Sequence, residues 1–187
     1  MTVKRVEVLA YAKINLMLDI IRRRTDGYHD LFMIMQSVGV ADRVTVEREP
    51  GRKLRLTASM DDIPLDDKNI AWKAAALFFK TTGLRRPGLH IHLEKHIPHA
   101  AGLAGGSADG AAVLVALNRL MGTDLSTDSC APWACRSVQM CLLHCRRHLP
   151  CTGDWRGAQS LKAYAVLSYC TGKAGLWCEY RQGLRLV

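Results

Sequence analysis

The chain has 187 residues, 49% of them hydrophobic, and it carries 26 Lys and Arg residues against 17 Asp and Glu, a formal net charge of +9. This length allows one domain with a sizeable core, and the composition favours a globular protein. Because basic and acidic residues are interspersed, the charge indicates a solvated basic surface and we expect no nucleic-acid partner. The N-terminus lacks the apolar core of a secretory signal, and no segment is long enough to span a membrane. We therefore expect a cytoplasmic protein without a membrane partner and without disulfides.

The N-terminal part of the chain has the pattern of strands. Val3–Ala12 and Ile14–Ile21 are extended apolar segments, and a polar turn over Arg22–Asp30 separates them from a further apolar run at Leu31–Val40. Shorter segments alternate apolar and polar residues, as half-buried antiparallel strands do: Arg43–Glu47 and Lys53–Thr57, with the same alternation at Leu89–Leu93.

Two segments are predicted to be helices. Asn69–Thr82 follows a polar loop and carries apolar residues at helical spacing, with Gly83 as its stop. Ala108–Met121 is apolar enough to be buried on several sides. Strands followed by helix, strand, loop and helix predict an α/β (α+β) fold, with a mixed sheet and helices packed on one face.

A glycine-rich loop precedes the second helix. Glycines allow the backbone to approach an anion closely, and the free N–H groups and dipole of a helix N-terminus attract negative charge. Ser107 is expected to be the N-cap. No Lys-Ser or Lys-Thr follows the glycines, which excludes a Walker A loop, and the G-x-G-x-x-G order is absent. The segment predicts either a phosphate-binding loop or an ordinary strand–helix link.

Several polar residues stand out among the strands. Lys13 interrupts an apolar strand, and Asn15 lies two residues on, so the pair forms either a solvent-facing edge or a polar cluster beside a pocket. Tyr28 and His29 follow an Asp-Gly turn. They are either surface residues of the turn without a function, or an aromatic surface for a ligand ring together with an imidazole that can form hydrogen bonds. His90 and His92 share a strand face without a nearby acid or cysteine, and we interpret them as exposed, not as metal ligands.

The character of the sequence changes near Thr127. All seven cysteines (Cys130, Cys135, Cys141, Cys145, Cys151, Cys170 and Cys178) follow this point, and hydrophobic periodicity becomes poor. Their spacing with His144 and His148 is only loosely zinc-like, because no C-x2-C pair is present. We therefore predict two regions, residues 1–127 and 128–187, and no metal site.

The genetic code offers another explanation of the tail. Codons for Ser137–Leu143 can be chosen so that a reading frame starting one base earlier encodes Gly-Ala-Asp-Val-Pro-Phe. Met140 has a single codon and the Cys141 codon begins with TG, so the shifted valine is forced, and only Asp or Asn can precede it. The hypothesis is that residues 128–187 are translated out of frame.

The order of four motifs resembles the GHMP kinase superfamily. These are Ala12-Lys-Ile-Asn15, Asp26-Gly-Tyr-His29, Asp67-Lys-Asn-Ile70 and Pro98-x3-Gly-Leu-x-Gly-Gly-Ser107. The first two point, within the superfamily, to the members that phosphorylate a cytidine-diphosphate-linked methylerythritol in non-mevalonate isoprenoid synthesis. The resemblance covers about Val6 to Ser126. It implies an N-terminal domain like the second domain of ribosomal protein S5, followed in the family by a ferredoxin-like domain that is missing here.

The resemblance implies transfer of a phosphoryl group from ATP, with Mg²⁺, to the 2-hydroxyl of the small-molecule substrate. It places Lys13 beside the acceptor hydroxyl, Asn15 near the methylerythritol group, and Tyr28 and His29 on the cytidine ring. Asn69 would line the nucleotide site. The ATP phosphates would be wrapped by the loop residues Pro98, His99, Ala100, Ala101, Gly102, Leu103, Ala104, Gly105, Gly106, Ser107 and Ala108.

This sequence departs from the family pattern in three ways. Ala104 occupies a position usually held by glycine, which is tolerated if its φ is negative, and Gly110 one usually held by alanine. The family's catalytic base, the Asp of a Gly-Ala-Asp-Val-Pro segment, is absent in frame. We therefore expect a poorly active chain with exposed apolar surface. Another GHMP small-molecule kinase, a non-catalytic nucleotide-binding module and a zinc-stabilised nucleic-acid binder remain as alternatives.

Overall fold

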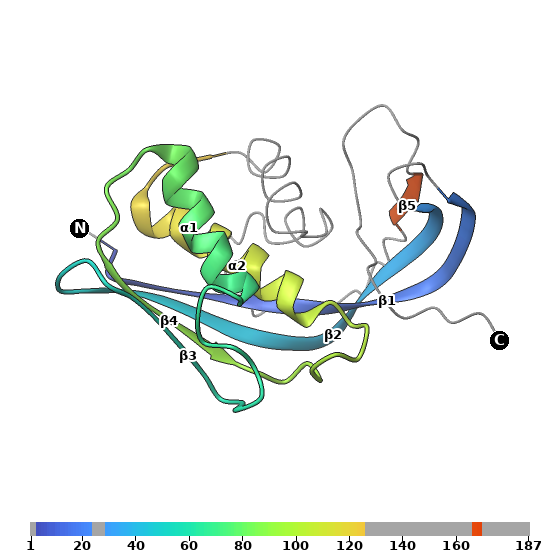
Figure 1. Ribbon diagram of the computed structural model, residues 1–187, viewed down its shortest axis with the longest axis horizontal. Coiled ribbons are helices and arrows are strands. Elements are labelled where there is room, and N and C mark those ends of the chain that lie inside the picture. The colour runs from blue at the N-terminus through green and yellow to red at the C-terminus, as the bar shows by residue number, and fades with distance from the viewer. Residues whose placement is uncertain (1–2, 24–28, 126–165, 170–187) are drawn as a thin grey trace, which may run out of the picture.

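The computed structural model describes residues 3–23, 29–125 and 166–169 (Figure 1). Over these residues the strands form one sheet of order β1-β2-β4-β3, and the short strand β5 pairs with β2. The elements in chain order are β1 (Arg5–Arg23), β2 (His29–Glu49), β3 (Leu54–Ala58), α1 (Ile70–Thr82), β4 (Gly88–Glu94), α2 (Gly105–Met121) and β5 (Val166–Tyr169).

The sheet is mixed, as the sequence predicts, but one pairing differs from the expectation. β1 with β2 and β2 with β4 are antiparallel, whereas β3 runs parallel to β4, with Leu54 opposite Leu89. The prediction of antiparallel pairing for the segment 53–57 is wrong. α1 lies between β3 and β4 in the chain, and such a crossover returns the chain in the parallel direction. Side-chain alternation is the same in both kinds of strand.

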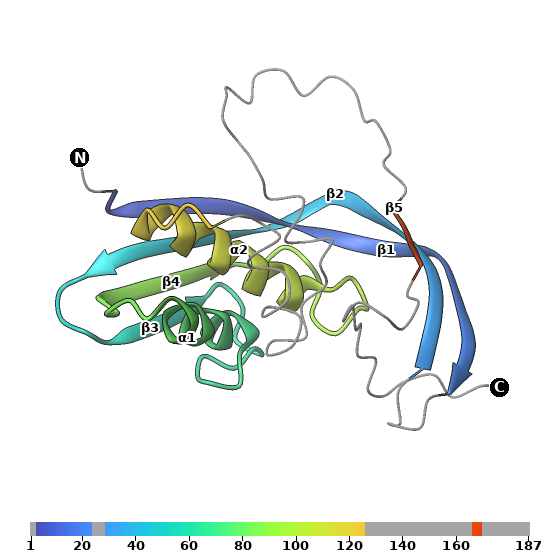
Figure 2. The ribbon, with the colours of Figure 1, turned by 90° about the horizontal axis from the view of Figure 1, so that it is seen from above.

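The core lies between the sheet and two helices that cover one of its faces (Figures 1 and 2). Every second residue at the start of β1 is buried, because alternate side chains of a strand point to the same face of the sheet. The same alternation fully buries three residues of β4, Leu89, Ile91 and Leu93. Phe78 of α1 and Leu117 of α2 meet them from the helical layer. The part of the sheet under the helices is therefore a conventional two-layer core.

β1 and β2 are much longer than the segments predicted from the sequence. The expected segments 3–12 and 14–21 form one strand, with a register shift between Tyr11 and Lys13. Beyond this shift the hairpin extends past the helices (Figure 2), and several apolar side chains of β1 are exposed there, Leu16 by 60% and Ile21 by 55%. No helix within the described ranges is long and apolar enough to cross a membrane.

Gly88 allows the start of β4 to lie directly against the end of β2. Its N–H donates to the carbonyl of Gly51 at 2.8 Å. A Cβ at this position would lie 2.5 Å from the carbonyl oxygen of Glu49 and 2.8 Å from that of Pro50. Both contacts are with backbone, which cannot rotate away, so only glycine fits without a shift of the β2–β3 turn.

We expect Gly88→Ala to lower the free energy of unfolding by about 2 kcal/mol, because the methyl group would force two strands apart. Chemical denaturation measures this effect. Gly39→Ala in β2 is the matched control, since a Cβ added there would have nothing within 4 Å. Equal stability of the two variants would show that the close approach at Gly88 is not a constraint.

Candidate functional site

The glycine-rich loop leads from β4 into α2, which begins at Gly105 and not at Ala108 as predicted. The N-cap is Ala104, in the left-handed conformation with φ of 61°, and no side chain caps the helix. The prediction that Ser107 is the N-cap is therefore wrong, because Ser107 lies inside the first turn. Ala104 also lacks the negative φ under which a methyl group there would be tolerated without strain.

The N-terminus of α2 offers backbone donors to an anion. The amide of Ala108 donates to the carbonyl of Ala104 at 2.9 Å and is the first amide bonded within the helix, so the amides of residues 105–107 have no acceptor inside it. These amides, together with the helix dipole, favour a negatively charged group at the loop. Residues 98–102 of the loop are exposed, and Gly102 has a φ of 72° that favours glycine.

Lys13 is joined to this loop by its backbone and by its side chain. Its N–H donates to the carbonyl of Leu103 at 3.0 Å, and its Nζ donates to the carbonyl of Gly102 at 3.0 Å. This contact lies where the pairing of β1 with β2 shifts register, since Tyr11 pairs with Ala41 while Lys13 pairs with Ser37. Lys13 is only 8% exposed, so the structure places it in a polar cluster beside the loop and not in solvent.

The other residues predicted for the site are placed less closely. The Oδ1 of Asn15 lies 3.4 Å from the Nζ of Lys13. Asn69 caps α1: its Oδ1 accepts from the N–H of Ala71 at 2.8 Å and its Nδ2 donates to the carbonyl of Pro64 at 2.7 Å. Tyr28 and the tail cysteines lie outside the described residues, and His29 is described only as the first residue of β2.

A buried group of charges lies behind the loop, and sequence reasoning missed it. Lys95 Nζ makes a short ion pair with Asp42 and another, of 2.7 Å, with Asp109. The Oδ1 of Asp42 also accepts from the backbone N–H groups of His96 and Ile97, at 2.6 and 2.8 Å. Asp42 thereby holds the segment that enters the loop, and Asp109 connects it to α2. A lone carboxylate in the apolar stretch of α2 was the signal, since a buried charge requires a partner.

The charge state of this cluster depends on burial. Burial raises the pKa of Asp109 to about 7, against the opposing effect of the Lys95 ammonium, and the neighbouring Asp42 adds to the rise. The Oδ1 of Asp109 is buried and has no hydrogen-bond partner among the described residues. Burial lowers the pKa of Lys95, but Asp109 and Asp42 outweigh it and raise that pKa overall, so the ammonium stays charged.

The histidine pair on β4 is not exposed as predicted. His90 and His92 are half-buried, and both rings contact the hydroxyl of Thr57 in β3 at 2.8 Å. Burial lowers the pKa of His90, with a further contribution from Arg55. The two histidines thus lie in the contact between the parallel strands β3 and β4. The alternation of residues within one strand cannot predict which side chains of a neighbouring strand will cover it.

We expect Ala104→Gly to raise the free energy of unfolding by about 1 kcal/mol, because glycine adopts the left-handed conformation without strain. Thermal or chemical unfolding measures it. Ala76→Gly, at an exposed position of α1, is the matched control and should instead lower stability by about 1 kcal/mol. Loss of stability in Ala104→Gly would contradict the conformation of this N-cap.

Asp109→Asn tests the titration of the buried carboxyl group. Its folded pKa of about 7 exceeds the ordinary 3.8, so the native state holds an extra proton between these values. The stability of the wild type relative to Asp109→Asn should therefore fall as pH rises through this window, by up to about 4 kcal/mol. Denaturation at a series of pH values measures the difference. Asp61→Asn, on an exposed loop, is the control, and a pH-independent difference for Asp109→Asn would contradict the burial effect.

Comparisons with known proteins agree with this arrangement. Residues 69–142 match the family described as GHMP kinases N terminal domain. The chain is 48% identical over 117 residues to the 4-diphosphocytidyl-2-C-methyl-D-erythritol kinase of Caldicellulosiruptor saccharolyticus, which covers 63% of this chain and 40% of that protein. It is 49% identical over 121 residues to the protein of the same name from Clostridium acetobutylicum, covering 65% of this chain and 42% of that one. The chain thus spans about 40% of the length of these relatives.

Solved structures show the same fold. A crystal structure of 4-(cytidine 5'-diphospho)-2C-methyl-D-erythritol kinase superimposes with a TM-score of 0.57 at 37% identity, covering 68% of this chain and 46% of the other. Homoserine kinase from Cytophaga hutchinsonii, at 21% identity, superimposes with a TM-score of 0.56 over 73% of this chain and 42% of its own, which shows the shared fold. The N-terminal portion of the chain therefore belongs to the GHMP kinase family and is its N-terminal domain.

Proposed function

We propose that this chain carries the N-terminal half of an ATP-dependent kinase that phosphorylates the 2-hydroxyl of 4-diphosphocytidyl-2-C-methyl-D-erythritol. The proposal rests on the two hydrogen bonds that Lys13 donates to carbonyl groups of the glycine-rich loop. The similarity to kinases of that name at 48–49% identity supports the substrate. The expected pathway is non-mevalonate isoprenoid synthesis.

The proposed roles follow from the chemistry of each group. Loop amides at residues 105–107 would hold the phosphates of ATP, since they lie at the positive end of α2. The Lys13 ammonium, buried beside the loop, would stabilise the charge that develops on the acceptor hydroxyl and the transferred phosphoryl group. Asn15, Tyr28 and His29 would bind the substrate. Asn69 would act by fixing the start of α1, because its amide already caps that helix.

Mg²⁺ is the cofactor least supported by the residues present. Among the described residues there is no group of three or more His, Cys, Asp or Glu side chains placed to hold a cation. Asp109, the carboxylate on α2 near the loop, is engaged with Lys95. We propose that any Mg²⁺ is held chiefly by the ATP phosphates and water, as this ion often is.

We further propose that the coding sequence changes frame near residue 127, so that residues 128–187 are not the kinase's own second half. The relatives extend far beyond the matched region. The apolar side chains of Leu16 and Ile21 on the long hairpin are exposed. This supports the proposal, because another part of a complete kinase would cover such an apolar surface. The family match runs past this boundary, to residue 142, so resequencing of the coding DNA is the direct test.

Two other functions are open to the same site. Another GHMP small-molecule kinase would share the fold, as the homoserine kinase structure does. A panel of acceptor substrates distinguishes it. A non-catalytic module would bind nucleotide without transferring phosphate, which Lys13 and the α2 N-terminus suffice to support.

The purified chain should bind ATP but show no appreciable turnover, because loss of a general base costs about 10²–10⁴-fold. Restoring the single base that recovers Gly-Ala-Asp-Val-Pro should restore turnover, measured as ADP formed with the cytidine-linked substrate. Lys13→Ala in the restored protein should abolish most of that gain while leaving the fold intact by circular dichroism. A normal kinase rate from the chain as it stands would refute the frame-change proposal but not the kinase assignment.

A further inference from the structure

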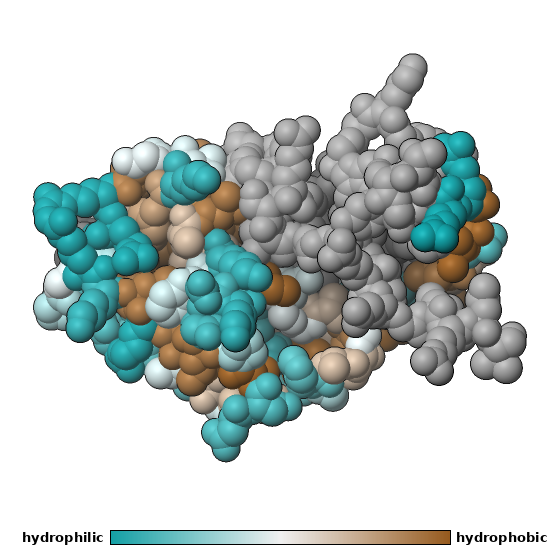
Figure 3. All heavy atoms as spheres, viewed as in Figure 1, coloured by the Kyte–Doolittle hydropathy of each residue, from teal (hydrophilic) through white to brown (hydrophobic). Residues whose placement is uncertain are grey.

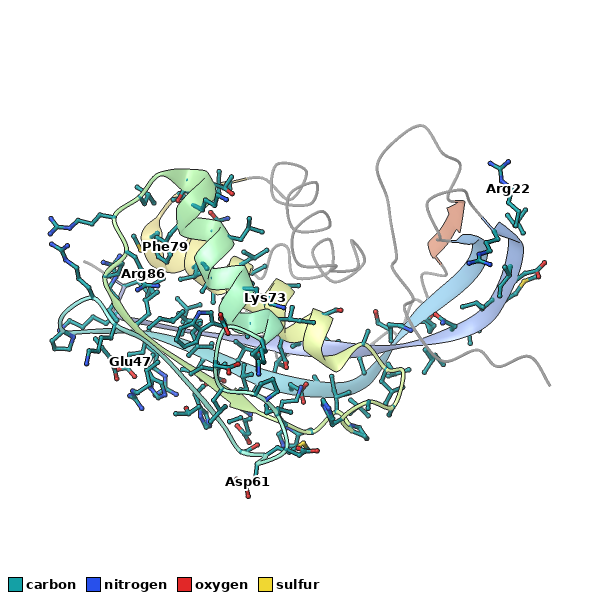
Figure 4. All side chains as sticks on the ribbon, viewed as in Figure 1. Arg22, Glu47, Asp61, Lys73, Phe79 and Arg86 are labelled. Atoms are coloured by element: carbon teal, nitrogen blue, oxygen red, sulfur yellow. The ribbon has the colours of Figure 1, made fainter. Side chains whose placement is uncertain are left out.

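A cleft lined by arginines lies at the end of the domain remote from the glycine-rich loop. Its volume is about 320 Å³, and four of its lining residues are arginines while the others carry no charge: Arg48, Arg52, Arg85 and Arg86, with Gly51, Pro87 and Met121. It adjoins the start of β4, whereas the loop follows the end of that strand, about 20 Å away at the usual rise per residue. Figure 4 shows Arg86 at that end of the sheet.

The positive charge of this cleft is not balanced locally. None of its four arginines forms an ion pair with a residue that the structure describes, whereas Arg43 pairs with Glu7 and Glu94, and Arg55 with Glu49. Four guanidinium groups lining one cleft repel one another. Figure 3 shows hydrophilic residues gathered over the end of the molecule where the β2–β3 turn and the α1–β4 connection lie. An anion in the cleft would relieve this repulsion.

Two of the arginines are fixed by hydrogen bonds to backbone. The Nη2 of Arg48 donates to the carbonyl of Leu120 at 2.8 Å, at the C-terminal end of α2, and lies 3.5 Å from the Sδ of Met121. The Nη2 of Arg86 donates to the carbonyl of Arg52 at 3.1 Å. The Nε of Arg48 is buried without a hydrogen-bond partner among the described residues. The cleft therefore combines pre-positioned guanidinium groups with an unused donor.

We propose that this cleft is a second anion-binding site, specific for a small oligophosphate and independent of the kinase site. The planar guanidinium group matches the spacing of phosphate oxygens and binds them with two hydrogen bonds at once. The volume is at the lower end of the range for small-molecule pockets, which suits a di- or triphosphate. No aromatic residue lines the cleft, so it lacks the stacking surface with which proteins bind single-stranded nucleic acid.

Calorimetric titration of the full chain with inorganic tripolyphosphate tests the proposal. Arg85→Gln removes an exposed arginine for which the structure shows no hydrogen bond or ion pair with a described residue, and it should weaken binding about tenfold, the effect of losing one charged contact. Lys73→Gln on α1 is the matched control, because it removes the same charge from an exposed site outside the cleft. Circular dichroism would verify that both variants fold as the parent does.

Two results would overturn the proposal. If Arg85→Gln and Lys73→Gln weaken the binding of tripolyphosphate equally, the binding depends only on the overall surface charge and not on the cleft. Binding unaffected by Arg85→Gln and by Arg52→Gln, but lost in Lys13→Ala, would place the anion at the glycine-rich loop instead. Failure of the kinase assay would leave this inference untouched, because no residue of the cleft belongs to the kinase site.

Discussion

The ion pairs of Lys95 with Asp42 and Asp109 are the constraint on which the candidate site depends. They join three elements that are distant in sequence, because Asp42 lies on β2, Lys95 follows β4 and Asp109 lies on α2. Breaking a buried ion pair leaves an uncompensated charge, which costs several kcal/mol. The entrance of the glycine-rich loop and the first turns of α2 are thus held at a fixed separation by charges that solvent does not reach.

A second attachment fixes the middle of the loop. Where the register of β1 shifts, Lys13 turns its N–H to Leu103 and its ammonium to Gly102. The loop is therefore held at its entrance by Asp42 and at its centre by β1, so the amides at the start of α2 need little rearrangement to receive an anion. Such preorganisation is the main contribution that a protein makes to phosphoryl transfer.

The sequence predicts the helices and strands of this fold and the residues of the glycine-rich loop. It does not predict the direction of strand pairing or the ion pairs between distant residues. Helical spacing and a glycine stop locate α1 to within a residue. Of the two interpretations that the sequence leaves open for Lys13 with Asn15, the structure shows the polar cluster. The parallel pairing of β3 was missed because alternation reports burial and not strand direction. The cluster at Lys95 was missed because its partners lie 53 and 14 residues away, and only tertiary structure brings them together.

Ala104 shows how local strain and global fold compete in this loop. Its position requires a left-handed backbone, which costs a non-glycine residue about 1–2 kcal/mol, and no side chain caps the helix in return. The helix nevertheless begins directly after it, at Gly105. Gly105 packs closely against the residues behind the loop, because a Cβ added there would lie 3.1 Å from Ile97 and 3.4 Å from Lys95 Nζ. Burial of α2 against the sheet and the attachment of Asp109 to Lys95 therefore outweigh the unfavourable N-cap. The conformation of the loop therefore depends on the packing behind it and on its hydrogen bonds to Lys13, and not on a favourable residue at the N-cap.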